Sequence, residues 1–284
     1  MPKALVIYNP VSGAKSLKNV PDIIQRVLKK HNYDYTWFET QKLKKQPLNQ
    51  FAKKRFQRII AIGGDGTVGE VIAFMVKNRI KTPLIIIPQG SANILAATLR
   101  IPLLNIKKAL TIGLTKESKP LDAMQINRTQ YGVIAAGMGY DVMMMKGTTR
   151  KLKRKIGLLA YGWTFLKTFL YYRAKPYRLT IDGKKHYLNA KAVMVFNILP
   201  FVELPIRKFP KIRPNDQQLN IIALNPCSLL RWFSGKHRRI QIFSGQEVSI
   251  KPKKESEYQV DGDLFKGKSL QIKIIPKAIN IVYV

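Results

Sequence analysis

The sequence predicts an α/β protein in two parts: an N-terminal domain around a parallel β-sheet, then a C-terminal domain built as an antiparallel β-sandwich. First, 284 residues exceed the usual length of a single domain. Second, apolar strand-like runs alternate with helical patterns in the first third, which is typical of a parallel sheet covered on both faces. Third, short strand-like segments dominate after residue 122. We therefore predict domains at residues 1–122 and 123–284, and the last strand could return toward the first domain.

Strands and helices alternate throughout the predicted first domain. Continuous apolar or β-branched runs predict buried strands, and apolar residues at helical spacing predict the helices between them. This gives strands at residues 3–9, 34–40, 58–64 and 83–90, and helices at residues 20–31, 49–56, 68–79 and 92–99.

The second domain is predicted from many short strands with little helix between them. Asp-Gly pairs at residues 182–183 and 261–262 are typical hairpin turns. One helix is expected, at residues 152–172. The strand candidates lie at residues 131–144, 177–188, 189–198, 219–225, 238–244, 246–251, 257–263, 269–275 and 278–284. Such regular short strands predict a sandwich or a barrel-like sheet.

The charge balance restricts the class of partner. The chain has 50 basic and 16 acidic residues and a formal charge of +34, which favours nucleic acid, an anionic membrane surface or phosphorylated small molecules. A solvated basic surface without a particular partner is the alternative. The single cysteine, Cys227, excludes an intrachain disulfide and agrees with a reducing compartment. The longest apolar stretch is interrupted by Lys167 and is shorter than the roughly 20 residues of a membrane span, so we expect a cytoplasmic protein, soluble or peripheral to the membrane.

The turn after the third predicted strand contains more glycine than a simple turn requires. Its residues are Gly63, Gly64, Asp65, Gly66 and Thr67, with Glu70 close behind. We expect the glycines to allow positive φ angles and to let backbone N–H groups converge. A following helix adds the positive end of its dipole, so the turn could hold phosphate. A carboxylate beside phosphate favours a nucleoside triphosphate with Mg²⁺, whereas a tight turn without a ligand is the alternative.

Three other strand ends in this half carry small or polar residues. They lie in the segments YNPVSG (8–13), FETQ (38–41) and PQGSAN (88–93). Ligands of open parallel sheets bind outside the carboxyl ends of the strands, where such turns gather. We therefore expect the four turns to form one site.

Several segments together resemble a known family. NPVSG, GGDGTVGEVI, IPQGSANILAATLRIP and the later YQVDGD resemble the diacylglycerol kinase catalytic-domain family, which includes sphingosine kinases and bacterial lipid kinases. AAGMGYD and KRKIGLLAY are similar to the second domain of that family, so the resemblance spans nearly the whole chain. It implies a nucleotide-binding α/β domain, a β-sandwich domain for the lipid substrate, an active site between them, and ATP and Mg²⁺ as cofactors.

The resemblance also implies roles for individual residues. Nucleotide binding falls to Asn9, Ser12, Thr40, Gly63, Gly64, Asp65, Gly66, Thr67, Glu70, Ser91 and Asn93. Asp65 and Asp122 match acidic residues that organise the metal. Asp261 matches the general base and is expected to work near its ordinary pKa, with Asp263 beside it in place of the more usual glutamate. From this segment alone, without the motifs of the first half, a hairpin turn at Asp261 and Gly262 is favoured over a catalytic role.

The sequence departs from the family pattern at two places. Ile94 stands where the family often has aspartate. In the stretch PKIRPNDQQLN, Asp216 remains, but Gln217 replaces a glycine and Asn220 replaces a second aspartate. Because an auxiliary Mg²⁺ site needs several oxygen ligands, we expect that site to be absent or weak.

A basic cluster adjoins an aromatic segment. Six of the ten residues at 146–155 are basic, and the apolar segment 156–172 follows. This pattern favours an interfacial segment on an anionic membrane. A surface helix that packs its apolar side on the sandwich is the alternative.

These observations predict an ATP-dependent lipid kinase that transfers the γ-phosphoryl group to the hydroxyl of diacylglycerol or a similar lipid, peripherally bound at a membrane. A sphingoid base or another lipid alcohol stays open as the acceptor. The alternative of another class is a catalytically impaired protein that binds nucleotide and membrane. Nucleic acid is not expected as a partner, because only the charge supports it. A homodimer stays open.

Overall fold

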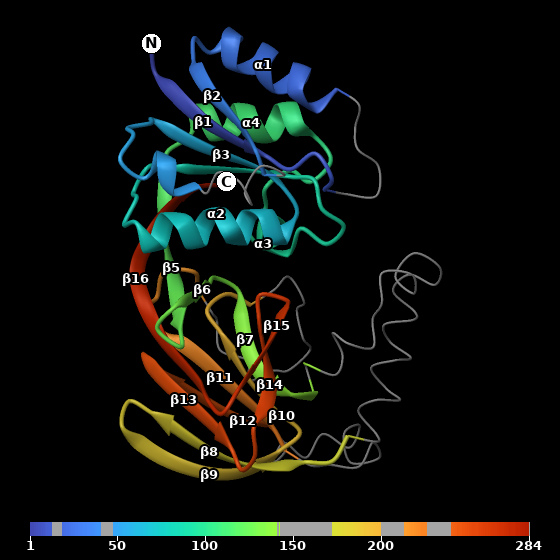
Figure 1. Ribbon diagram of the computed structural model, residues 1–284, viewed down its shortest axis with the longest axis vertical. Coiled ribbons are helices and arrows are strands. Elements are labelled where there is room, and N and C mark those ends of the chain that lie inside the picture. Colours follow the sequence, from blue (N-terminus) through green and yellow to red (C-terminus); the bar gives the residue numbers. More distant parts are fainter. Residues whose placement is uncertain are drawn as a thin grey trace.

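The computed structural model describes residues 1–12, 19–40, 48–140, 142, 172–199, 213–225 and 240–283 (Figure 1). Three features of the sequence lie outside these ranges: the basic cluster at 146–155, the helix expected at 152–172 except for its last residue, and Cys227. Within the described ranges, no helix is long and apolar enough to cross a membrane.

The first domain is a parallel sheet with helices on both faces. In chain order its elements are β1 (Lys3–Tyr8), α1 (Val20–Lys30), β2 (Asp34–Glu39), the 3₁₀ helix η2 (Leu48–Phe51), β3 (Arg58–Gly63), α2 (Asp65–Lys77), β4 (Leu84–Pro88), α3 (Ile94–Thr98) and α4 (Ile106–Thr115). The strands lie in the order β2-β1-β3-β4, all parallel. Helices α1 and α4 pack together on one side of this sheet, and α2 covers the other side (Figure 1). The carboxyl ends of these strands therefore meet at one edge.

The second domain consists of two facing sheets. Its strands are β5 (Ser118–Ile126), β6 (Gln130–Gly132), β7 (Ala135–Gly139), β8 (Lys175–Ile181), β9 (Lys184–Ala190), β10 (Ala192–Phe196), β11 (Leu219–Leu224), β12 (Ile240–Gly245), β13 (Glu247–Pro252), β14 (Ser256–Val260), β15 (Asp263–Gly267) and β16 (Leu270–Val282). One sheet has the antiparallel order β12-β11-β10-β7-β14-β15, and its partner contains β16-β13-β8-β9. An apolar core fills the space between them. The predicted fold class, a parallel-sheet α/β domain followed by an antiparallel sandwich, is confirmed.

Strand β16 connects the two domains. The sequence indicated two strands, at 269–275 and 278–284, but a single strand of 13 residues forms, with an irregularity between Ile275 and Ile279. Its first part pairs with β13, and its last part lies beside β4, where Ile281 pairs with Leu84 in parallel. Residues of β16 belong to both apolar cores. The division at residue 122 stays a prediction: β5 runs through that position, and β16 contributes residues to both cores.

Two elements of the first domain differ from the sequence prediction. The helix expected at 49–56 is only the short 3₁₀ helix η2, in which Phe51 packs edge-on against Phe38 with ring centroids 5.2 Å apart. Helix α4 was not predicted. Its start carries a recognisable signal, because the Asn105 side chain accepts a hydrogen bond of 2.8 Å from the N–H of Lys108.

Candidate active site

The turns after β1 and β3 are joined by a side-chain hydrogen bond. The Asn9 Nδ2 donates to the Thr67 Oγ1 over 2.8 Å, and the N–H of Asn9 donates to the carbonyl of Ile62 over 2.9 Å. Thr67 is buried in the first turn of α2. Asn9 thus fixes the first turn against the glycine-rich turn.

The glycines of the β3–α2 turn allow close approach and do not supply positive φ angles. Among the described glycines, only Gly139, Gly183 and Gly262 have positive φ, so positive φ was the wrong reason to expect glycine in this turn. A Cβ on Gly63 would lie 2.5 Å from the Thr67 Cβ. The reason for the glycine is therefore steric.

The turns after β3 and β4 also touch through glycine. A Cβ on Gly90 would lie 2.5 Å from the Cα of Gly64, so the two backbones can meet only without side chains. By contrast, a Cβ on Gly66 would meet nothing within 4 Å, which leaves that side of the turn open. A backbone bare on its open side can be approached closely by a ligand.

Asn93 shapes the turn after β4. It adopts a left-handed conformation with φ 49°, which asparagine tolerates better than most residues. Its Oδ1 accepts from the N–H of Gly90 over 2.7 Å, and its Nδ2 donates to the Gly90 carbonyl over 2.9 Å. This turn also meets the glycine-rich turn through Asp65, whose Oδ1 accepts a long hydrogen bond of 3.4 Å from the N–H of Leu95.

The remaining residues of the predicted nucleotide site lie at the same edge of the sheet. Ser12 donates its N–H to the Asn9 carbonyl over 3.3 Å. Thr40 directly follows β2, whose last residue Glu39 pairs with Tyr8, the neighbour of Asn9. Ser91 is exposed in the turn that Asn93 shapes.

A cavity of about 320 Å³ lies beside the glycine-rich turn and holds residues from both domains. One wall is α2, and the other consists of β6 and the hairpin of β14 and β15. The carboxylates that line it are Asp65, Glu70, Asp261 and Asp263. The cavity therefore brings together the acidic residues of the glycine-rich turn and those of the Asp-Gly hairpin.

Asp261 is held by backbone groups inside the hairpin turn. It adopts a positive φ of 46°, followed by Gly262 at 103°. Its carboxylate accepts hydrogen bonds from the N–H groups of Val133 at 2.7 Å, Ile134 at 2.9 Å and Ala135 at 2.9 Å. Burial raises the pKa of Asp261, the three amide hydrogen bonds lower it, and the negative charge of Asp263 raises it further. The resulting pKa of Asp261 lies above its ordinary value, whereas the sequence led us to expect the ordinary value. These hydrogen bonds attach the hairpin to the first residue of β7 and to the two residues before it.

Asp263 and Glu70 face each other from opposite walls of the cavity. Among the described residues, the Asp263 carboxylate has no hydrogen-bond or ion-pair partner, and it is exposed. Burial, and then the negative charge of Asp263, raise the pKa of the Glu70 carboxyl. Three backbone amides bind the Asp261 carboxylate, whereas the described residues leave both oxygens of Asp263 open to a substrate.

The influence of Asp263 on Glu70 can be measured directly. In Asp263→Asn the electrostatic part of the effect disappears and the burial part stays, so the Glu70 pKa should fall but remain above its ordinary value. In the wild type, the pKa of Glu70 is higher in the folded than in the unfolded chain, so protonation of Glu70 favours the folded state. This stabilising contribution is present at low pH and is lost as the pH rises from the unfolded to the folded pKa. NMR titration of the Glu70 side-chain carbonyl measures both proteins; identical curves would contradict the facing arrangement.

Asp122 does not lie with the acidic residues of the cavity. It is fully buried, its Oδ1 accepts from the N–H of Lys277 and its Oδ2 from the N–H of Gln217, both over 2.7 Å. The resemblance assigned it to the metal, but the structure gives it backbone partners from β16 and from the segment before β11. Its role here is to join these segments at the domain junction.

The altered stretch around Asp216 is also held by backbone amides. The Asp216 carboxylate accepts from the N–H groups of Arg213 at 3.2 Å and Gln218 at 3.1 Å. Gln217, which replaces the family's glycine, has a positive φ of 60°. The described residues contain no group of three His, Cys, Asp or Glu side chains that could hold a metal ion. The weakness of the auxiliary Mg²⁺ site stays a prediction.

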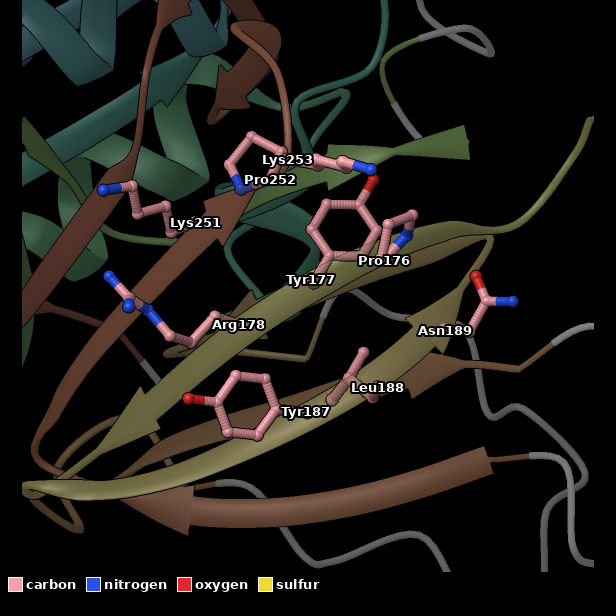
Figure 2. Close-up of a pocket in the computed structure, with 9 residues that line it drawn as sticks. All are labelled: Pro176, Tyr177, Arg178, Tyr187, Leu188, Asn189, Lys251, Pro252 and Lys253. Carbon is pink, nitrogen blue, oxygen red and sulfur yellow. The ribbon is translucent and has the colours of Figure 1, made fainter.

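A larger hollow, of about 600 Å³, is lined by residues of β8 and β9, by the end of β13 and by the residue after it (Figure 2). Arg178, Lys251 and Lys253 line it together with tyrosine, leucine, asparagine and proline, and no carboxylate of the described residues does. Phosphoryl transfer to an alcohol requires a group that accepts the hydroxyl proton. The smaller cavity with four carboxylates is therefore the candidate active site.

The donor set of this cavity fits a metal that arrives with a nucleotide. Mg²⁺ is bound in such sites by one or two carboxylates together with substrate phosphates, rather than by a cage of protein ligands. Asp65 lies at the start of α2 beside a turn whose open side is bare backbone at Gly66. Asp65 could thus provide the carboxylate, and the turn could approach the phosphates.

Comparison with known proteins agrees with this arrangement. The diacylglycerol kinase catalytic domain matches residues 3–126, and the YegS C-terminal NAD kinase beta sandwich-like domain matches residues 132–283, more than half of the chain. Diacylglycerol kinase of Bacillus subtilis (strain 168) is 26% identical over 280 residues, which cover 93% of this chain and 90% of the relative. An uncharacterized protein of Synechocystis sp. is 24% identical over 304 residues, which cover 97% of this chain and 69% of the relative.

A solved structure extends the likeness to three dimensions. The crystal structure of a diacylglycerol kinase from Bacillus anthracis str. Sterne has a TM-score of 0.75 at 22% identity and covers 99% of this chain and 97% of its own. At that identity it supports the fold alone. The family models and the named relative, together with the fold, define a two-domain kinase with an alcohol acceptor. The chain belongs to the family of lipid kinases that join a diacylglycerol kinase catalytic domain to a YegS-type β-sandwich-like domain.

Proposed function

We propose that this protein transfers the γ-phosphoryl group of ATP to the hydroxyl of a diacylglycerol-like lipid. The observation that carries the proposal is the cavity shared by the glycine-rich turn and the hairpin of β14 and β15. Nucleotide phosphates and a hydroxyl acceptor must meet in line in such a reaction, and most of the catalysis is positioning and neutralisation of charge. One wall of this cavity, with the glycine-rich turn, would position the phosphates, and the other wall, with the hairpin, would position the hydroxyl acceptor.

The nucleotide belongs on the side of the first domain. The turns after β1, β3 and β4 are locked together by Asn9, by the contact of Gly64 with Gly90, and by Asn93. Asp65 is the carboxylate that would face Mg²⁺ bound to the phosphates. The metal, when bound, supplies neutralisation of the charge that develops on the transferring phosphoryl group.

The acceptor belongs on the side of the hairpin. Asp263 is exposed to the cavity and would take the proton of the attacking hydroxyl, whereas Asp261 holds the hairpin in place. Phe74 and Phe265 line the same cavity and offer apolar surface to the lipid. This assignment moves the general base from Asp261, as the resemblance implied, to the neighbouring acidic residue.

The test is phosphorylation of a total lipid extract with radiolabelled ATP and Mg²⁺, followed by identification of the labelled lipid. We expect one main product, a phosphorylated diacylglycerol. A labelled sphingoid base or another lipid alcohol would change the acceptor but keep the kinase. Nucleotide binding without any labelled lipid would favour the catalytically impaired alternative, to which the replacement of the family's aspartate by Ile94 could contribute.

We further propose that the kinase works at an anionic membrane surface. Tyr187, Arg178 and Lys251 lie opposite one another on the neighbouring strands β9, β8 and β13, and their polar ends point the same way (Figure 2). Tyr187 is 77% exposed. An exposed aromatic ring beside cations is typical of residues that contact lipid headgroups.

The double variant Arg178→Ala/Lys251→Ala should bind anionic vesicles about thirtyfold more weakly at low salt, because each cation near such a surface contributes roughly 1 kcal/mol. Lys29→Ala/Lys30→Ala removes the same charge from the exposed last turn of α1 and is the matched control. Vesicle co-sedimentation measures both. Equal weakening of the two variants would show that net charge, and not this face, governs binding.

A further inference from the structure

A second cavity, of about 420 Å³, adjoins the candidate active site. Lys77 and Tyr131 line both cavities, so the two spaces share a wall. The second cavity lies where the end of α2 meets β5 and the irregular part of β16. Among the described residues, its lining includes the cations Lys77, Arg79 and Lys81 and no acidic residue.

Arg79 stands in a position where glycine is usual. The N–H of Ile80 donates to the carbonyl of Met75 over 2.9 Å and the N–H of Arg79 to that of Val76 over 3.1 Å, which is the Schellman motif that ends a helix. Arg79 has a φ of 54°, in the left-handed region that costs an L-residue about 1–2 kcal/mol. Arginine at this position therefore brings a side chain to the cavity at the expense of backbone strain.

The end of α3 provides a natural comparison. There the N–H of Ile101 donates to the carbonyl of Ala96 over 2.8 Å, the N–H of Arg100 donates to that of Ala97 over 3.0 Å, and Arg100 has a φ of 56°. The backbone geometry is the same, but Arg100 lines neither of the two adjoining cavities. The two arginines differ in surroundings rather than in strain.

The three cations of the second cavity have no acidic partner among the described residues. In the described ranges neither Lys77, Arg79 nor Lys81 forms an ion pair. The Nζ of Lys81 donates to the carbonyls of Lys277 at 2.6 Å and Ala278 at 2.9 Å, which fixes its ammonium group against β16. Like charges gathered around one cavity repel one another, and an anion placed among them would remove that repulsion.

We propose that this cavity binds a phosphate group through Arg79, Lys81 and Lys77. A planar guanidinium beside ammonium groups suits phosphate oxygens, and Gln125 and Tyr131 add hydrogen-bonding groups to the wall. The phosphate could belong to the headgroup of an anionic phospholipid or to a soluble phosphate compound. Phosphate binding in this cavity does not depend on catalysis. Because the cavity shares Lys77 and Tyr131 with the candidate active site, a bound phosphate could also extend the acceptor site, and only that role rests on the proposed lipid kinase function.

The experiment compares Arg79→Gly with Arg100→Gly. Each variant removes one positive charge and relieves the same backbone strain, so neither should lower the melting temperature. Inorganic phosphate is titrated into labelled protein at constant ionic strength, and the amide resonances of Tyr131 and Ala278 are followed by NMR. We expect saturable shifts in the wild type and in Arg100→Gly, and an affinity reduced about tenfold or more in Arg79→Gly.

A second arm replaces inorganic phosphate with a soluble short-chain phosphatidylglycerol. Tighter binding in this arm identifies a lipid headgroup as the source, and tighter binding of inorganic phosphate identifies a soluble compound. Resonance shifts that Arg79→Gly leaves unchanged in both arms would overturn the proposal. Because neither arm measures turnover, a protein that binds phosphate here but phosphorylates no lipid would contradict only the proposed function.

Discussion

Asp263→Asn should lower kcat for lipid phosphorylation by about a hundred- to ten-thousandfold, the contribution expected of a general base. The Asp263 carboxylate lies in the cavity and is exposed, so its replacement by a neutral group of the same shape removes no hydrogen bond that the described residues make to it. The free energy of unfolding should therefore stay within about 0.5 kcal/mol of the wild type. Single-turnover kinetics and denaturant unfolding measure the two quantities.

Asp261→Asn is the matched comparison, two residues away in the same hairpin. An asparagine offers one oxygen where Asp261 uses two, so one of the N–H groups of Val133, Ile134 and Ala135 would face an amide nitrogen. Leaving a buried donor unsatisfied costs about 1–3 kcal/mol, and we expect a loss of stability of that size. If instead Asp261→Asn abolished activity at unchanged stability while Asp263→Asn remained active, Asp261 would be the base.

Asp65→Asn should reduce the rate of phosphoryl transfer by about a hundred- to a thousandfold, the range seen when one preorganised electrostatic contact to a transition state is lost. Asparagine can still accept from the N–H of Leu95, so the contact between the two turns survives and the fold should be unchanged. The loss should fall on kcat, because the charge of the carboxylate matters most when the metal and the phosphoryl group move.

Asp22→Asn is the control for the charge itself. Asp22 is an exposed aspartate in the first turn of α1, as Asp65 is in the first turn of α2, but it does not line the cavity. Its replacement should leave the rate unchanged. Near-normal activity of Asp65→Asn at saturating Mg²⁺ and ATP would remove this residue from the metal site.

The sequence was enough to find the segments of the site but not the function of each residue. Strands and turns follow from local patterns, so the glycine-rich turn and the Asp-Gly hairpin could be located. The steric reason for the two glycines could not be predicted. Gly63 is required because the Thr67 side chain lies against it, and Gly90 because the backbone of Gly64 lies against it. Both contacts depend on the folded arrangement of the turns and cannot be deduced from the sequence pattern.

Two acidic residues show the same limit more sharply. Asp122 has the right residue type near the end of the first domain, but only the folded chain shows that amides from residues 217 and 277 take both its oxygens. Asp261 and Asp263 both line the cavity, and only the folded hairpin shows that backbone amides bind the carboxylate of Asp261 and not that of Asp263 among the described residues. The second cavity could not be predicted from the sequence, since α2, β5 and β16 meet there from distant parts of the chain.

The late position of β16 in the chain has a consequence for biosynthesis. The first core includes Ile279, Ile281 and Val282, although its other strands are translated long before them. Until those residues emerge from the ribosome, the edge of β4 and part of an apolar core remain uncovered, and open strand edges are where chains aggregate. The first domain therefore completes its core only after β16 has been synthesised, so its last step of folding depends on the strand that it shares with the second domain.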